Sequence, residues 1–164
     1  MKQFRYYIFL LLSFSITSTF SQSKVTLDWN AKIKLSKTGD PTIVLTVKAD
    51  SSLYTVSMFQ DTAENYVIPI SVIMDKNQNI EFDGKWTEFP VAIKSMHRAL
   101  QEGLYLRENT SYTSTLILKT KSDFTSIFTI TYWALNEQIA YPPQALDFLL
   151  RQKDGVLTVV KAGK

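Results

Sequence analysis

Few residues in this sequence of 164 could do chemistry, because it contains one histidine and no cysteine. Without cysteine there is no disulfide, no thiolate metal site and no cysteine nucleophile. His97 lies between basic residues in the segment 94–98. We expect it to be an exposed loop residue, because a catalytic or metal-binding role needs partners that the sequence does not locate. Composition therefore argues against most enzyme classes, and we expect no catalytic residue, no metal and no cofactor.

The segment 129–148 is the most informative part of the chain. Its alternating residues predict a strand that runs into a tight polar turn at Asn136–Gln138. The double proline Pro142–Pro143 then ends the strand pairing before another strand begins. Aromatic residues crowd this segment. It is either a packed hairpin whose prolines protect a sheet edge, or the rim of a binding site.

The elements that must position this segment are β-strands. Apolar and polar residues alternate over short stretches that are separated by turn residues. The turns at 36–41, 121–123 and 153–155 predict hairpins, and the helix formers in 95–102 predict one turn of helix. The expected β-segments are 25–29, 33–35, 43–49, 53–58, 67–74, 91–94, 112–120, 124–134, 145–150 and 156–161.

This pattern predicts an all-β fold of about seven to nine antiparallel strands. Two packed sheets, each burying one face, account for the alternation. A closed barrel stays open as an alternative, because the number of strands does not separate it from a sandwich.

The first residues have the pattern of a secretory signal. A basic start, an apolar run at 6–14 and small residues at Thr19 and Ser21 predict cleavage before Gln22. The apolar run is too short to span a bilayer, so we expect no membrane span after cleavage. Residues 22–164 are then expected to form one domain, exported to the periplasm or cell envelope of a Gram-negative bacterium.

Charge gives no indication of a nucleic-acid partner. Cleavage removes Lys2 and Arg5 from 18 basic residues and leaves 15 acidic ones, so the net charge falls from +3 to +1. A nearly neutral domain has no electrostatic footprint for nucleic acid or for anionic lipid.

The segment 130–148 resembles the end of the N-terminal periplasmic domain of the thiol:disulfide interchange protein DsbD, a domain also found in cytochrome c biogenesis reductases. That family has the pattern I-x-Y-x-x-C-x-D/N-x-x-C-x-P-P-x-x-x-x-F. Ile130, Tyr132, the two prolines and Phe148 match it here. The two cysteine positions fall on Leu135 and Ala140. Weaker matches to the same family precede this segment in the expected order, at Trp29, Leu53–Tyr54, 84–90 and 113–118.

The resemblance implies an immunoglobulin-like β-sandwich. It also implies a redox domain without its chemistry, because leucine and alanine cannot attack a disulfide or resolve a mixed one. We therefore expect a non-catalytic, DsbD-like module that binds a periplasmic thioredoxin-like protein or another envelope protein. The expected binding rim is Tyr132, Trp133, Asn136, Glu137 and Tyr141, with Tyr54 opposite.

Two other functions are kept as alternatives. One is an envelope sandwich that binds a small ligand or glycan and shares only the fold. The other, less favoured, is a reductase that works through a partner's thiols. Burial bears on the rim, because Tyr132 and Trp133 point to opposite faces of a regular strand and at most one of them should lie in the core.

Overall fold

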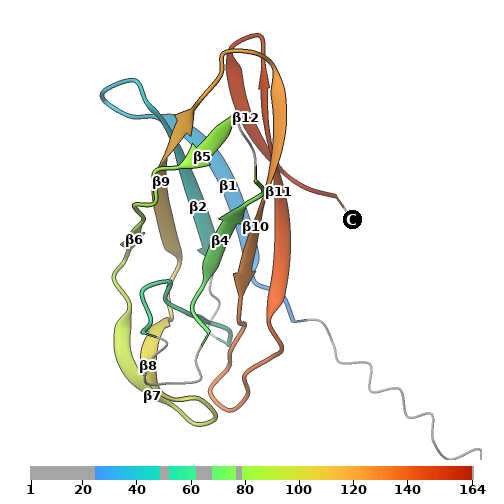
Figure 1. Cartoon of the computed structure of the whole chain (residues 1–164). Coiled ribbons are helices and arrows are strands. Elements are labelled where there is room, and N and C mark those ends of the chain that lie inside the picture. The colour runs from blue at the N-terminus through green and yellow to red at the C-terminus, as the bar shows by residue number, and fades with distance from the viewer. Residues whose placement is uncertain (1–24, 49–51, 62–67, 77–78, 164) are drawn as a thin grey trace, which may run out of the picture.

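The computed structural model describes residues 25–48, 52–61, 68–76 and 79–163, so the predicted signal at 1–21 lies outside the described residues. The described residues form twelve β-strands and no helix (Figure 1). The all-β prediction is confirmed, and the strands are more numerous than expected because several have only two or three residues. In this part of the chain no helix has the length and apolar character needed to cross a bilayer.

The first sheet is built on the two strands predicted around the 36–41 turn. β1 (Asp28–Leu35) and β2 (Pro41–Lys48) pair antiparallel, and β2 pairs in turn with β9 (Thr110–Leu118). Two short strands, β5 (Ile80–Phe82) and β6 (Thr87–Phe89), pair with the other edge of β9. The segments predicted at 25–29 and 33–35 thus belong to one strand and the residues leading into it.

The second sheet is antiparallel throughout. Its strands lie in the order β12 (Val156–Lys161), β11 (Gln144–Lys153), β10 (Phe124–Tyr132) and β4 (Ser71–Met74). The predicted hairpin at 153–155 is confirmed: it joins β11 to β12, with positive φ at Asp154 (50°) and Gly155 (76°). Two such residues in a two-residue loop give the turn that matches strand twist.

The hairpin predicted at 121–123 is wrong. β9 lies in the first sheet and β10 in the second, so this turn carries the chain from one sheet to the other. The Gln152 side chain holds the crossing by donating hydrogen bonds to the carbonyl oxygens of Thr120 (3.5 Å) and Ser122 (3.1 Å). A short polar turn has the same sequence signature whether or not the strands that it joins pair with each other.

Aromatic side chains fill the space between the two sheets. Trp29 of β1 packs on Tyr112 of β9 and on Tyr132 of β10, with ring centroids 5.9 and 5.4 Å apart. In the second sheet Phe128 stacks on Phe148 at 5.2 Å. All five side chains are buried. The two sheets therefore face each other as a sandwich, and the barrel alternative is not the one adopted.

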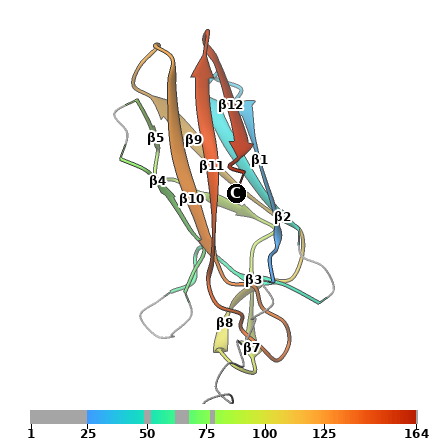
Figure 2. The ribbon, with the colours of Figure 1, turned by 90° about the vertical axis from the view of Figure 1, so that its right-hand side faces the viewer.

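A third, smaller sheet closes one end of the sandwich (Figures 1 and 2). This cap sheet has the order β3-β8-β7, formed by β3 (Thr55–Val56), β8 (Gln101–Leu106) and β7 (Ile93–His97). The Glu88 carboxylate ties it to the first sheet by accepting hydrogen bonds from the Ser57 hydroxyl (2.8 Å) and from the backbone N–H of Ala92 (3.2 Å).

The cap sheet also corrects the predicted turn of helix at 95–102. β7 and β8 pair antiparallel, with Lys94 opposite Leu104 and Met96 opposite Glu102, and residues 98–100 form the turn between them. The helix propensity of residues 99–102 is a local preference, and the pairing of two strands outweighs it.

Candidate functional site

The site predicted from the sequence is a short hairpin, residues 134–141, that extends from β10 and β11 toward the cap sheet (Figure 1). Backbone hydrogen bonds from Asn136 to Ile139 (3.0 Å) and from Tyr141 to Ala134 (3.0 Å) hold its two sides together. The Asn136 side chain makes the turn, because its Oδ1 accepts from the N–H groups of Gln138 (2.9 Å) and Ile139 (2.8 Å). We call this element hairpin 134–141.

Leu135 and Ala140 lie directly opposite each other across this hairpin, as an antiparallel bridge. Because the hydrogen bonds flank them, they form a non-hydrogen-bonded pair, in which Cα atoms are about 4.5 Å apart. That separation lies within the range that a disulfide requires, about 4.4–6.8 Å. The positions that the resemblance assigned to the two cysteines are therefore neighbours in space.

β3 covers this pair from one side. Tyr54 and Leu135 exchange backbone hydrogen bonds of 2.9 Å in both directions, so the residue before β3 pairs with the hairpin. The Tyr54 hydroxyl also donates to the carbonyl oxygen of Asn136 (3.2 Å). Leu135 is fully buried in a small apolar cluster with Tyr54, Val56 and Tyr105, and Trp133 and Ala140 pack against the cluster.

His97 anchors the hairpin from β7. Its Nε2 lies 2.7 Å from the carbonyl oxygen of Asn136, and its Nδ1 accepts the N–H groups of Ala99 (3.0 Å) and Leu100 (3.1 Å). An Nδ1 that accepts two hydrogen bonds carries no proton, so Nε2 is the donor to Asn136. The ring is 2% exposed and packs against Tyr54 and Tyr105. The expectation of an exposed loop histidine is wrong.

An ion pair crosses the outside of the site. Arg107, which follows β8, places its guanidinium 4.3 Å above the ring of Tyr54 and pairs with the Glu137 carboxylate. The hydrogen bond from Arg107 holds the pKa of Glu137 below its usual value and raises the pKa of Arg107. Burial raises the pKa of the Tyr54 hydroxyl. Glu137 is thus an anion at neutral pH, held by the guanidinium that lies over Tyr54.

The structure brings together most of the predicted rim but does not expose all of it. Tyr132 is completely buried in the main core and Tyr54 is 4% exposed, so neither presents a contact surface, which corrects their place in the rim. Glu137 is exposed, whereas Trp133, Asn136 and Tyr141 are half-buried. Tyr132 and Trp133 pack into separate clusters, as expected from their opposite faces.

Sequence reasoning missed three residues of this site. Tyr105 lies in β8 and Arg107 directly follows it, in a segment where the sequence predicted no element, so nothing placed them near the hairpin. Ile139, at the tip, is 51% exposed although it is apolar. An isoleucine inside a polar turn was the one signal available in the sequence.

Gly103 permits the close packing under the site. A Cβ at this position would lie 3.0 Å from the Tyr105 ring and 3.2 Å from Oε1 of Gln60. That oxygen accepts a hydrogen bond of 2.6 Å from the N–H of Leu104. An alanine here would therefore require the two side chains to shift by a few tenths of an ångström.

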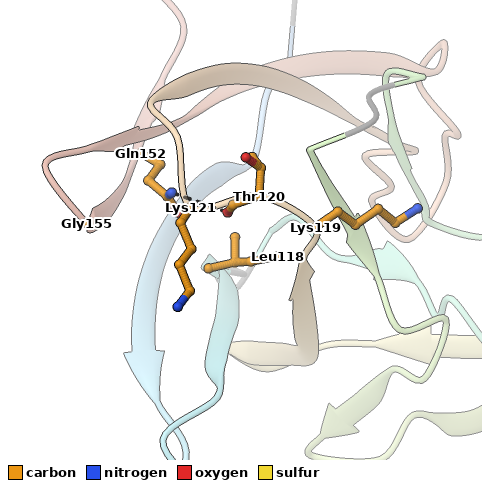
Figure 3. A pocket seen from close by; sticks show the side chains of 6 residues that line it. All are labelled: Leu118, Lys119, Thr120, Lys121, Gln152 and Gly155. Carbon is orange, nitrogen blue, oxygen red and sulfur yellow. Dashed lines mark hydrogen bonds between the residues drawn. The ribbon is translucent and has the colours of Figure 1, made fainter.

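The large cavities are remote from the hairpin. One of about 520 Å³ lies where the β9–β10 crossing meets the β11–β12 turn, at the opposite end of the sandwich, lined by Leu118, Lys119, Thr120, Lys121, Gln152 and Gly155 (Figure 3). A groove of about 270 Å³ lies beside the site, and Ile93, Tyr105 and Arg107 are among its lining residues. Among the described residues, no group of three or more His, Asp or Glu side chains is placed to hold a metal ion.

The fold is similar to that of one solved structure, the crystal structure of the Neisseria meningitidis DsbD N-terminal domain in the reduced form. The TM-score is 0.55, with 10% identity over 82% of this chain and 90% of that chain. The chain has the fold of a DsbD N-terminal domain, which is immunoglobulin-like. At this identity the similarity concerns the fold alone. No protein-family model matches the sequence, and no curated protein matches it either.

A DsbD-like fold without cysteine cannot perform thiol–disulfide exchange by itself. The exchange needs a thiolate that attacks a disulfide sulfur, and the sequence contains none. The side chains at the two positions are apolar and packed, so these positions carry no thiol chemistry. At the surface the hairpin presents the Arg107–Glu137 pair and an apolar tip.

Proposed function

We propose that this chain is a redox-inactive, DsbD-like domain that binds a protein partner through hairpin 134–141. The mature chain, residues 22–164, would act in the periplasm or cell envelope of a Gram-negative bacterium. The partner class that the fold suggests is a thioredoxin-like protein or another envelope protein, in an accessory role.

The observation that carries this proposal is the pairing of Leu135 with Ala140 beneath Tyr54. Thiol–disulfide exchange requires that a partner docks directly over the reacting pair. Here the pair has the spacing of a disulfide and the hairpin packs against the cap sheet, but neither position carries a thiol. A docking surface is what remains useful when the reaction is removed.

The accessible residues define the surface to test. Ile139 at the tip is half exposed, and the side chains of Glu137 and Arg107 are 70% and 42% exposed. Trp133 and Tyr141 are half-buried behind them. An apolar tip, a fixed ion pair and half-buried aromatic rings are the composition of a protein-binding surface.

A small-ligand or glycan site is the second candidate, favoured by the groove that Tyr105 and Arg107 line. Its volume of about 270 Å³ is smaller than the roughly 300–1,000 Å³ of ordinary ligand pockets. We therefore favour the protein partner.

The test is isothermal titration calorimetry with purified exported thioredoxin-like proteins from the same genome. We expect binding by the wild type, a loss of at least tenfold in affinity for Ile139→Asp, and no change for Leu35→Asp. Leu35 is the control, because it is an exposed aliphatic residue on the first sheet, 74% exposed against 51% for Ile139. Wild-type binding that is insensitive to Ile139→Asp would refute the proposal, and no binding by any of these proteins would refute a thioredoxin-like partner. A glycan array on the same protein tests the second candidate.

A further inference from the structure

The second sheet turns its outer face toward the viewer in Figure 2. Its strand register and side-chain exposure place a row of aliphatic side chains across this face. Ile127 of β10 lies opposite Leu149 of β11, and Leu149 lies opposite Val160 of β12. Ile127 is 36% exposed and Val160 57% exposed, and Leu149 is half-buried between them. We call these three residues the outer row.

The core does not explain the outer row. Alternate residues of the same strands, such as Phe128 and Phe148, already fill the space between the sheets. The solvent face of an antiparallel sheet is usually polar, and contiguous exposed aliphatic residues mark a surface that another molecule covers. Ile73 of β4, 64% exposed, extends the apolar surface beside Thr129.

Two opposite charges lie on either side of this row. Asp147 and Arg151 are two residues before and after Leu149 on β11, so their side chains share its face, and both are exposed. The Asp147 carboxylate accepts a hydrogen bond from the Thr129 hydroxyl (2.7 Å). Neither charge takes part in the ion pairs found among the described residues.

We propose that this face binds a second copy of the chain, about a two-fold axis that lies along the outer row. Such an axis stacks Leu149 on Leu149 of the second copy and reverses the strand direction. It therefore sets Asp147 against Arg151 of the second copy, and Arg151 against Asp147, so one surface is complementary to itself. A two-fold axis along the strands would instead set Asp147 against Asp147 of the second copy. Because these like charges repel, the arrangement of charges favours the axis along the outer row.

The size of the face indicates how tight this dimer is. β10 has nine residues, and four strands about 4.8 Å apart with a rise of about 3.4 Å per residue make a face of roughly 15 by 30 Å. That corresponds to the small end of specific interfaces, so we expect a dissociation constant on the order of 10–100 µM. Asp75 follows β4 and is exposed beside Ile127. In this dimer it would face Asp75 of the second copy, but only at the rim of the interface, where water and salt screen like charges.

Analytical ultracentrifugation of the purified exported form tests this dimer. We expect a reversible monomer–dimer equilibrium in the wild type. Asp147→Arg and Arg151→Asp each set like charges against each other and should raise the dissociation constant at least tenfold. The double variant Asp147→Arg/Arg151→Asp restores opposite charges across the axis and should return the constant to within about threefold of the wild type.

The charge exchange separates loss of contact from loss of fold, because a merely misfolded single variant is not rescued by a second substitution. Leu35→Asp, on the other sheet, should leave the equilibrium unchanged. A wild type that stays monomeric up to about 1 mM, or a double variant as weak as the single ones, would overturn the proposal and assign the outer row to a different partner. The result is independent of the proposed function, which concerns the hairpin at the end of the sandwich.

Discussion

Leu135 illustrates at the residue scale how the candidate site is held by packing. Its side chain is fully buried with Tyr54, Val56 and Tyr105. Truncation to alanine leaves a cavity, because the backbone around it is fixed by hydrogen bonds to Tyr54. We expect Leu135→Ala to lower the free energy of unfolding by about 2–5 kcal/mol in chemical denaturation. Ile139→Ala, on the exposed side of the same hairpin, should stay within about 0.5 kcal/mol, and equal effects would show that Leu135 is not packed as described.

Glu137 gives a pH prediction at the same scale. Its pKa is lowered in the folded state by the hydrogen bond from Arg107. The stabilisation from this pair is therefore complete above the ordinary glutamate pKa of about 4.3 and is lost as the pH falls through the lower folded-state value. In a carbon-detected NMR titration, the Glu137 carboxyl should titrate at lower pH in the wild type than in Arg107→Met. Lys94→Met, which removes the Lys94–Glu102 pair instead, should not change the Glu137 midpoint. Identical midpoints in the wild type and Arg107→Met would contradict the ion pair.

The burial of His97 could not be predicted from its neighbours in the sequence alone. Its basic neighbours Lys94 and Arg98 suggested solvent, and both are indeed exposed. In the strand β7, however, the side chains of Lys94 and Met96 share one face and that of His97 lies on the other. The expectation failed because the local sequence was interpreted as a loop before a helix, where this alternation has no meaning.

At the element scale, hairpin 134–141 has the geometry of a disulfide site without the sulfur atoms. Leu135 and Ala140 form a non-hydrogen-bonded antiparallel pair. We therefore expect Leu135→Cys/Ala140→Cys to form a disulfide on air oxidation, detected by mass spectrometry after thiol alkylation with and without reductant. Leu135→Cys/Ile139→Cys is the matched control, because these positions are not opposite each other, and it should stay reduced. Two free thiols in the first variant, under conditions where it is folded, would refute the pairing.

The sequence predicted every strand of eight residues or more. The long strands β1, β2, β9, β10 and β11 were found because eight to ten residues contain several periods of alternation. β5 and β6 were missed because three residues contain too few. The hairpin itself was predicted from its polar turn and double proline. Tyr54 was expected opposite the hairpin from the family resemblance, and it pairs with Leu135. The contacts of the hairpin with β7 and β8 were not predicted, since they depend on pairings between distant segments.

At the scale of the whole molecule, two separate apolar clusters predict uneven stability. The main core joins the two large sheets, whereas the cap sheet rests on the small cluster around Tyr54 and Leu135. Local opening costs least where least apolar surface is buried. In hydrogen–deuterium exchange, the amides of β7 and β8 should exchange faster than those of β2, β9, β10 and the central part of β11. Equal protection would show that the cap sheet and the sandwich unfold as one unit.

The overall architecture was predictable as two packed sheets, but the assignment of strands to sheets was not. The turn at 121–123 shows the reason: residues 119–124 are compatible both with a hairpin and with a crossing between sheets. The choice depends on what the faces of β9 and β10 bury, and in the structure Tyr112 and Phe128 face the same core from opposite sides.

The apolar pair at Leu135 and Ala140 also determines how the protein responds to its surroundings. A dithiol exists in two covalent states, and the ambient reduction potential sets the balance between them. Leucine and alanine exist in one state at any potential. The surface over hairpin 134–141 therefore has the same shape and charge in an oxidising or a reducing compartment, and whatever binds it meets a constant affinity where a redox-active domain would offer a variable one.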